Sequence, residues 1–111
     1  MRVGETVRTD FGGEQFEWSS EKSEWTLRTR GFSFSIAAEV FFDATGLVEF
    51  NSIDEHGEER YHIIGKTEGG ALAAVLFVVY SERENNGKPS IRIISARKAS
   101  SKECRRYQGM V

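Results

Sequence analysis

The sequence contains few residues of the types that build disulfides, metal sites or rigid turns: one cysteine, one proline and two histidines among 111 residues. Cys104 alone cannot form an internal disulfide, and a single thiol is typical of a reducing cytoplasm. Because His56, His62 and Cys104 stand at unrelated spacings, we find no metal-ligand motif and expect no metal and no other cofactor. These shortages exclude a disulfide scaffold and disfavour a metalloenzyme.

Long hydrophobic runs are also lacking. The longest, residues 71–80, is shorter than the roughly 20 residues that span a bilayer, so it indicates a buried strand. The N-terminus carries Arg2, Glu5 and Arg8 instead of a secretory apolar segment. With 39% hydrophobic and 12% aromatic residues, the sequence predicts one small cytoplasmic domain with a packed core and no membrane contact.

Charge is distributed unevenly along the chain. The segment from Ile91 to the C-terminus holds six of the 15 Lys and Arg residues and one of the 17 acidic residues. A formal net charge of -2 therefore hides a basic end on an acidic body. Such asymmetry suggests a surface that faces a polyanion, with phosphate as the leading candidate ligand.

The N-terminal half predicts one strand and two helices. Residues 1–15 show no clear period and are interpreted as a weakly ordered lead-in, with a short strand near residues 3–7 as an alternative; residues 16–111 form the single domain. A strand at residues 16–18 is followed by a helix that Ser19 or Ser20 caps and Gly31 ends. Ser33 caps a second helix over residues 34–42, where apolar residues recur at helical spacing.

The second half has the period of strands. Strands over residues 47–50, 60–67, 71–81 and 91–97 are separated by short turn-rich segments, which predicts an antiparallel meander. Ser100 and Glu103 form a capping box for a final helix over residues 101–108. The fold class is therefore α+β: an antiparallel sheet made of an N-terminal strand and a four-strand meander, with two N-terminal helices and a C-terminal helix.

Strand alternation predicts where the basic side chains converge. Arg60 and His62 share one face of their strand, Arg83 follows the central strand, and in the last strand Arg92, Ile94, Ala96 and Lys98 share a face. A sheet with helices on one face would then gather Arg60, His62, Arg83 and Arg92 on the other, with Arg97 and Lys98 at its edge.

Each of these residues also has an ordinary structural interpretation. Arg60 and Arg83 stand beside glutamates and could form surface ion pairs of little energy. A strand histidine such as His62 is more often packed or hydrogen-bonded than catalytic, and His56 is interpreted as a turn residue. Lys22 suits a solvated helix face, and Arg105 and Arg106 suit the negative end of the last helix as well as a ligand.

Eight segments between residues 16 and 99 form one pattern. They are Phe16-Glu17-Trp18, Lys22, residues 31–34, 37–43, 57–61 and 64–65, residues 78–83 (Val-Val-Tyr-Ser-Glu-Arg), and residues 91–99 (Ile-Arg-Ile-Ile-Ser-Ala-Arg-Lys-Ala). In order and spacing they resemble a known family, the BrnT toxins of type II toxin–antitoxin systems. The resemblance covers roughly residues 16–107, and its last segment is highly specific.

The resemblance implies a RelE-like fold and a ribonuclease that cuts RNA, with or without the ribosome, and inhibits translation. It also implies a partner, a ribbon–helix–helix antitoxin that neutralises the toxin and through which alone the pair contacts operon DNA. Carried over by position, the active-surface residues are Lys22, Arg60, Arg83, Arg92, Arg97 and Lys98.

The chemistry expected of such an enzyme is metal-independent attack of the substrate's own 2′-hydroxyl on the adjacent phosphate. We predict Arg60, Arg83 and Arg92 as phosphate-binding catalytic residues, because guanidinium donors match two phosphate oxygens and stay charged. Lys22, Arg97, Lys98 and Arg105 would bind the RNA. The general base stays open among His62, a lysine and a carboxylate such as Glu59.

The competing hypothesis is a non-catalytic module, a degenerate toxin that binds its antitoxin or nucleic acid without cutting. Two features favour it: the acidic body of the chain, and Thr29-Arg30-Gly31 where the family usually has Lys-His-Gly.

Overall fold

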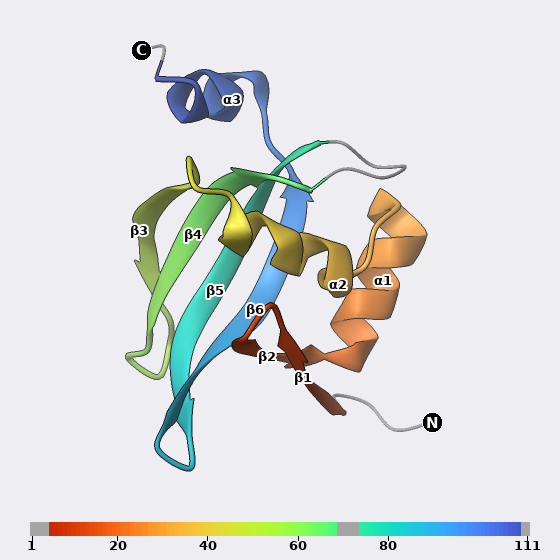
Figure 1. Ribbon diagram of the computed structural model, residues 1–111, viewed down its shortest axis with the longest axis vertical. Coiled ribbons are helices and arrows are strands. Elements are labelled where there is room, and N and C mark those ends of the chain that lie inside the picture. Colours follow the sequence, from red (N-terminus) through yellow and green to blue (C-terminus); the bar gives the residue numbers. More distant parts are fainter. Residues whose placement is uncertain (1–4, 69–73, 110–111) are drawn as a thin grey trace.

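One six-stranded sheet organises the chain, with helices packed on one of its faces (Figure 1). The computed structural model describes residues 5–68 and 74–109. The strands lie in the order β1-β2-β6-β5-β4-β3. The elements are β1 (Thr6–Phe11), β2 (Glu14–Ser19), α1 (Ser20–Arg30), α2 (Phe34–Ala37), the 3₁₀ helix η1 (Ala38–Phe42), β3 (Leu47–Ile53), β4 (Glu59–Lys66), β5 (Val75–Asn85), β6 (Lys88–Lys98) and α3 (Ser101–Tyr107).

The α+β class and the antiparallel meander of β3, β4, β5 and β6 are confirmed. Two parts of the sheet prediction are wrong. The sheet has six strands instead of five, and it is mixed, because β2 pairs with β6 in parallel. A parallel pair needs a long crossover connection, so neighbouring turn signals in the sequence cannot reveal it.

The sixth strand comes from the N-terminal segment, where the sequence shows no clear period. β1 and β2 form a hairpin whose turn, Gly12-Gly13, has φ values of 60° and 86°. The expected short strand near residues 3–7 lies instead at Thr6–Phe11. Because β1 is an edge strand and most of it is exposed, it lacks the apolar alternation by which strands are recognised. The two adjacent glycines were the available signal.

Helix α1 begins and ends as predicted. The Ser19 side chain accepts a hydrogen bond from the backbone N–H of Lys22, and Gly31 ends the helix in the left-handed conformation, with φ 88°. These caps place Lys22 in the first turn of the helix, next to the end of β2.

The second predicted helix is not one continuous α-helix. It consists of the single turn α2 followed by the 3₁₀ helix η1. The apolar residues at helical spacing, Phe34, Ala37, Ala38 and Phe41, all pack in or against the core, as expected. Val40 is buried there as well, which brings the segment close to the sheet. Gly65 of β4 permits that close approach: a Cβ atom there would lie 3.0 Å from the carbonyl oxygen of Val40.

Strand lengths differ from the sequence-based bounds mainly at the β5–β6 hairpin. Asn85 pairs with Lys88, so the hairpin closes on the two-residue turn Asn86-Gly87, with φ values of 53° and 79°. The turn-rich segment expected between the last two strands is therefore mostly strand, with Asn86 and Gly87 in the turn. The predicted start of the third meander strand, residues 71–73, lies outside the described residues.

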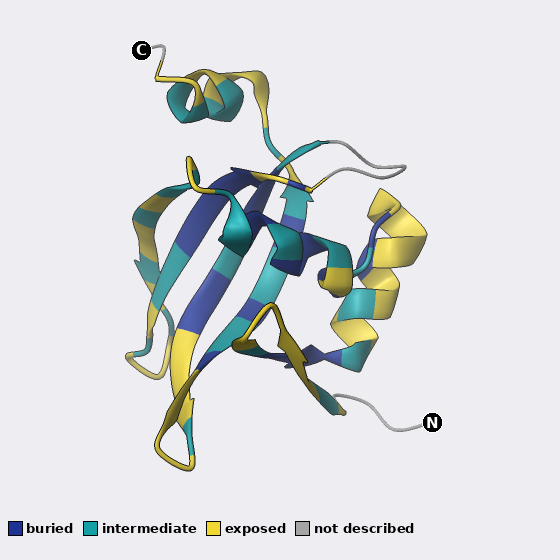
Figure 2. Ribbon diagram, viewed as in Figure 1, coloured by how far each residue is buried: buried dark blue, intermediate teal, exposed yellow. Residues whose placement is uncertain are grey.

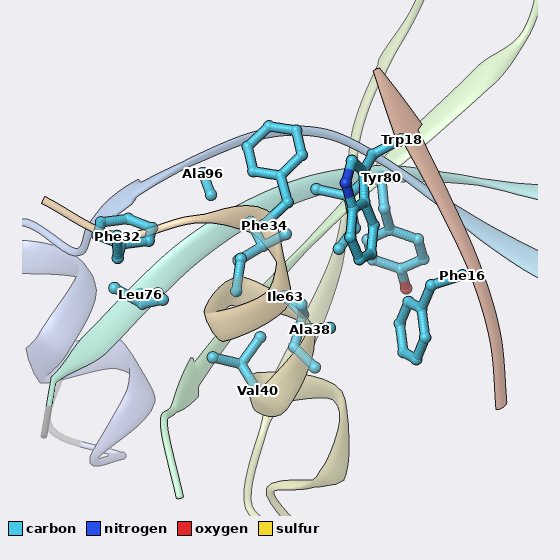
Figure 3. Packing of buried hydrophobic residues seen from close by; sticks show 13 residues of the cluster. Phe16, Trp18, Phe32, Phe34, Ala38, Val40, Ile63, Leu76, Tyr80 and Ala96 are labelled. Atoms are coloured by element: carbon cyan, nitrogen blue, oxygen red, sulfur yellow. The ribbon is translucent and has the colours of Figure 1, made fainter. Parts of the chain in front are cut away.

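The hydrophobic core lies between the sheet and the α2–η1 segment (Figures 2 and 3). Its large members include Phe16 and Trp18 from β2, Phe34 from α2, and Ile63 and Tyr80 from the meander. The opposite face of the sheet is therefore not covered by α2 or η1.

Helix α3 starts with the predicted capping box of Ser100 and Glu103. It lies beyond one end of the sheet (Figure 1) and is tied to the end of η1, because the Tyr107 hydroxyl donates to Asp43 at 2.5 Å. Burial alone would raise the pKa of Asp43, but hydrogen bonds from Tyr107, Lys66 and Thr45 lower it to about 2. None of the helices in residues 5–68 and 74–109 is long and apolar enough to cross a membrane.

We predict that Gly65→Ala lowers the free energy of unfolding by about 1–3 kcal/mol, because the added methyl group meets the rigid backbone of Val40. Urea unfolding should show a lower midpoint at an unchanged slope. Ser35→Ala, at an exposed position of α2, is the control and should change the midpoint little. An unchanged midpoint for Gly65→Ala would contradict the close packing of η1 on β4.

Candidate nucleic-acid interface

The sheet face opposite the core helices, called the open face below, carries most of the predicted site residues. Trp18, Ile63, Tyr80 and Ile93 belong to the core. Because side chains alternate along a strand, their neighbours Glu17, His62, Ser81 and Arg92 point to the open face.

A β-bulge decides which residues of β6 reach that face. Val79 pairs with Ser95 and Tyr80 with Ile93, which leaves Ile94 as an extra residue in β6. The alternation is shifted there, so Ile93 and Ala96 both lie in the core. The prediction that Arg92, Ile94, Ala96 and Lys98 share a face is therefore wrong. Strict alternation assumes a regular strand, and the sequence does not reveal where a bulge interrupts it.

Four predicted site residues line one pocket of the open face, called the arginine pocket below. Its volume is about 290 Å³, and Lys22, Arg60, Arg83 and Arg92 all contribute to it. They come from α1, β4, β5 and β6, so only the folded sheet brings them together. Arg60, Ser81 and Arg92 lie in one row across three strands. Tyr61 of β4 pairs with Tyr80 of β5, which places Arg60 opposite Ser81, and Ser81 pairs with Arg92 of β6.

Each arginine of the pocket has a carboxylate partner. Arg83 Nε lies 2.8 Å from Glu58 Oε2, and Arg60 Nη2 lies 3.5 Å from Asp54 Oδ2. Arg92 Nη1 lies 2.9 Å from Glu17 Oε2. A phosphate entering the pocket must therefore share or replace these carboxylates. Lys22 is exposed, and its side chain has no partner within the described part of the chain.

Glu17 is the most buried of these acids, with 3% of its surface exposed. One carboxylate oxygen accepts a hydrogen bond from Asn85 Nδ2 at 2.8 Å, and the other accepts one from Arg92 Nη1. Arg8 Nε lies 3.9 Å away. Burial alone would raise the pKa of Glu17, but the hydrogen bonds from Asn85 and Arg92 and the charges of Arg92 and Arg8 outweigh it and lower the pKa.

Among the residues that the structure describes, two buried polar atoms beside the pocket, Arg60 Nε and Ser81 Oγ, have no hydrogen-bond partner. Ser81 is fully buried, in the row of the sheet between Arg92 and Arg60. A buried donor without a partner costs about 1–3 kcal/mol.

His56 is a pocket residue that the sequence analysis missed. It lines the arginine pocket from the β3–β4 turn. Asp54 holds that turn by accepting hydrogen bonds at 2.8 Å from the backbone N–H groups of His56 and Glu58. In the sequence, His56 stands in a short turn shortly before Arg60. A turn position favours a structural role, so the sequence does not point to this residue as part of the site.

His62 lies on the open face but does not line the arginine pocket. Its Nε2 lies 2.7 Å from Glu49 and its Nδ1 lies 3.1 Å from Asn51. The ring stacks on Phe77, with centroids 4.3 Å apart. Both ring nitrogens are engaged, so this geometry does not support the predicted proton transfer by His62.

The other predicted RNA-binding residues lie away from the arginine pocket. Arg97 forms a two-pronged ion pair with Glu103 of α3, at 2.7 and 2.8 Å, and stacks over Phe77. The hydrogen bonds to Glu103 raise the pKa of Arg97. Lys98 follows at the exposed end of β6, and Arg105 is exposed on α3. Arg97 therefore anchors α3 to the sheet.

Glu59, a candidate base, also lies outside the pocket. It accepts a hydrogen bond from the Tyr61 hydroxyl at 2.9 Å, and Tyr61 packs on the side of the core helices. Across residues 5–68 and 74–109, no three His, Cys, Asp or Glu residues are grouped as metal ligands.

Comparison with known proteins supplies a family. Residues 18–103 match the family described as ribonuclease toxin, BrnT, of type II toxin–antitoxin systems. No curated protein matches the chain. The matched range contains all four cationic residues of the arginine pocket.

We predict that Glu103→Gln removes part of the pH dependence of stability. The Arg97 hydrogen bonds and the backbone N–H of Ser100 outweigh burial and lower the pKa of Glu103 from 4.5 to about 2. Because the folded-state pKa is lowered, its contribution is present above about pH 4.5 and is lost as the pH falls towards 2.

Urea unfolding between pH 2 and 7 measures this effect. The variant should be less stable than the parent at pH 7, and the difference should shrink as the pH falls. Arg97→Gln, which removes the partner and keeps the carboxyl group, should behave in the same way. A constant difference at every pH would contradict the ion pair.

Proposed function

The chain belongs to the BrnT family of ribonuclease toxins of type II toxin–antitoxin systems, and we propose that it is a metal-independent endoribonuclease that cuts RNA at the arginine pocket. By this cleavage it blocks translation in the cytoplasm, on or off the ribosome. A ribbon–helix–helix antitoxin neutralises it and provides the pair's contact with operon DNA. We also propose that the fold is RelE-like, on the basis of its helices packed against an antiparallel meander.

The observation that carries the proposal is the convergence of Lys22, Arg60, Arg83 and Arg92 in one pocket. RNA cleavage through the 2′-hydroxyl needs positive donors around a phosphate whose charge and crowding increase in the transition state. Guanidinium groups from three neighbouring strands supply such donors on a rigid frame, which lowers the cost of alignment.

In the proposed reaction the 2′-oxygen attacks the adjacent phosphorus, and the bond from phosphorus to the 5′-oxygen breaks. The products are a 2′,3′-cyclic phosphate and a 5′-hydroxyl end. Arg60, Arg83 and Arg92 hold the phosphate oxygens. We assign two proton transfers. His56, whose side chain is 82% exposed, accepts the proton of the 2′-hydroxyl, and Lys22 donates a proton to the 5′-oxygen. Arg97, Lys98 and Arg105 then contact more distant RNA.

Carboxylates in the pocket regulate this binding. Glu58 and Asp54 hold Arg83 and Arg60 when no ligand is present. The phosphate takes their place, and Arg60 Nε and Ser81 Oγ gain an acceptor or a bridging water. The acids thus keep the arginines oriented and weaken binding of non-specific polyanions.

The same ion pairs support a second candidate function, a non-catalytic toxin homologue that binds its antitoxin. In this alternative the arginines serve the fold, and the pocket stays closed by its own carboxylates. Cleavage assays separate the two candidates, because the second binds its partner and leaves RNA intact.

We predict that Arg60→Gln and Arg83→Gln each reduce RNA cleavage by about 100-fold or more, as loss of a transition-state donor does elsewhere. Arg92 is tested as the double variant Arg92→Gln, Glu17→Gln, because Arg92→Gln alone would leave a buried charge unpaired. The measurement is the rate of cleavage of a labelled messenger RNA, with and without EDTA.

Arg28→Gln is the matched control, since it removes the same charge from an exposed position of α1. It should cut RNA at nearly the parental rate. Parental activity that disappears in EDTA would contradict the metal-independent reaction. If all the pocket variants cut like the control, the pocket is not the active site.

We also predict that Glu58→Gln strengthens RNA binding severalfold at low salt, because it frees Arg83 from its carboxylate partner. The probe is a 2′-O-methyl oligonucleotide, which cannot be cut through its 2′-oxygen, and the readout is fluorescence anisotropy. Glu84→Gln is the control, since it removes the same charge from β5 without touching an arginine ion pair in the described structure. Equal effects of the two variants would show that only overall charge matters.

A further inference from the structure

A second pocket lies beside the arginine pocket, between the β1–β2 hairpin and the β5–β6 hairpin. We call it the hairpin pocket. Its volume is about 440 Å³, and its lining includes Arg8, Asp10, Gln15, Asn86 and Lys88. Neither the family assignment nor the proposed reaction gives these residues a role.

Glu17 joins the two pockets. Arg92, which lines the arginine pocket, forms an ion pair with one carboxylate oxygen of Glu17. Asn85 and Arg8, which line the hairpin pocket, lie at the other oxygen, and Ser90 Oγ is 3.5 Å from it. A ligand that extends beyond Arg92 along the open face therefore reaches Arg8 next.

The hairpin pocket offers two kinds of group to such a ligand. Arg8 and Lys88 are cations suited to a phosphate. The Gln15 and Asn86 side chains make no hydrogen bond within the described residues, so their amide donors and acceptors are free. Amides read base edges through paired hydrogen bonds, and a carboxylate such as Asp10 can accept from a base amino group.

Backbone geometry fixes the two turns that border the pocket. Asn86 has φ 53° and Gly87 has φ 79°, so the β5–β6 turn is tight and presents the Asn86 amide at a defined position. The facing hairpin closes at Gly12 and Gly13, also at positive φ. Two tight turns therefore border the pocket.

We propose that the hairpin pocket binds the nucleotide next to the scissile phosphate in the same RNA strand, with its base against Gln15 and Asn86 and its outer phosphate on Arg8 and Lys88. This inference rests on the proposed function, because it extends the path of the RNA that the arginine pocket would cut. It makes the hairpin pocket a determinant of sequence preference.

The first experiment measures binding, which does not depend on cleavage. A single-stranded 2′-O-methyl RNA octamer is titrated into parent, Arg8→Gln, Lys88→Gln and the control Arg28→Gln over a range of salt concentrations. Arg8→Gln and Lys88→Gln should each weaken binding and lower the slope of log affinity against log salt by about 0.7, the value for one phosphate contact on a single strand. If both match Arg28→Gln, the proposal is wrong.

The second experiment tests recognition of the base. Parent, Gln15→Ala and Asn86→Gly are compared on a set of RNA substrates. The substrates differ in the base immediately before the cut or in the base immediately after it. Glycine tolerates the positive φ of residue 86, so Asn86→Gly removes the amide without straining the turn. The ratio of kcat/KM between the best and worst neighbouring base should fall at least threefold in both variants.

The outcomes separate this proposal from the proposed function. Cleavage by the parent with unchanged base ratios in both variants overturns the hairpin-pocket proposal and leaves the nuclease intact. RNA binding that depends on Arg8 and Lys88 but never leads to cleavage supports the RNA path and overturns the nuclease. Thermal melting of each variant establishes that the changes reflect the pocket and not unfolding.

Discussion

Glu17 and Arg92 face each other across the parallel pair of β2 and β6, and their ion pair links the two parts of the sheet. Among the described strands, the N-terminal hairpin pairs with β6 alone. A carboxylate this buried is tolerated because Arg92 and Asn85 supply charge-assisted hydrogen bonds. The same carboxylate contacts Arg92, which lines the arginine pocket, and Arg8, which lines the hairpin pocket, so one buried charge links the sheet to both candidate sites.

Ion pairing also explains how an acidic chain can present the proposed phosphate site. The formal charge is -2, yet the open face gathers cations from four elements and sets a carboxylate beside each arginine. In such an arrangement affinity depends on how well a ligand competes with the protein's own acids. A phosphate that meets several guanidinium groups at once gains more than a diffuse polyanion does, which favours specific over general binding.

Much of the fold could be predicted from local pattern. The caps at Ser19 and Gly31, the capping box at Ser100 and the order of the meander strands all follow from signals a few residues long. The parallel partner of β2 could not be predicted in this way, because it pairs segments separated by most of the chain. The convergence of Arg60, Arg83 and Arg92 was anticipated from strand alternation, whereas the place of His56 in the pocket and the partners of His62 were not. Their surroundings are set by a turn and by side chains of a neighbouring strand.

The sequence by itself determined the residue types available for phosphate binding, the family, and most of the segments that become helix or strand. These properties depend on side-chain chemistry and on periods of two or three to four residues. Only the tertiary structure decided which cations share a pocket and which acids hold them. The bulge at Ile94 shows the reason: one extra residue in a ladder reverses the face of every residue after it. Burial and ion pairing depend on contacts between strands that are distant in the sequence, so no local pattern predicts them.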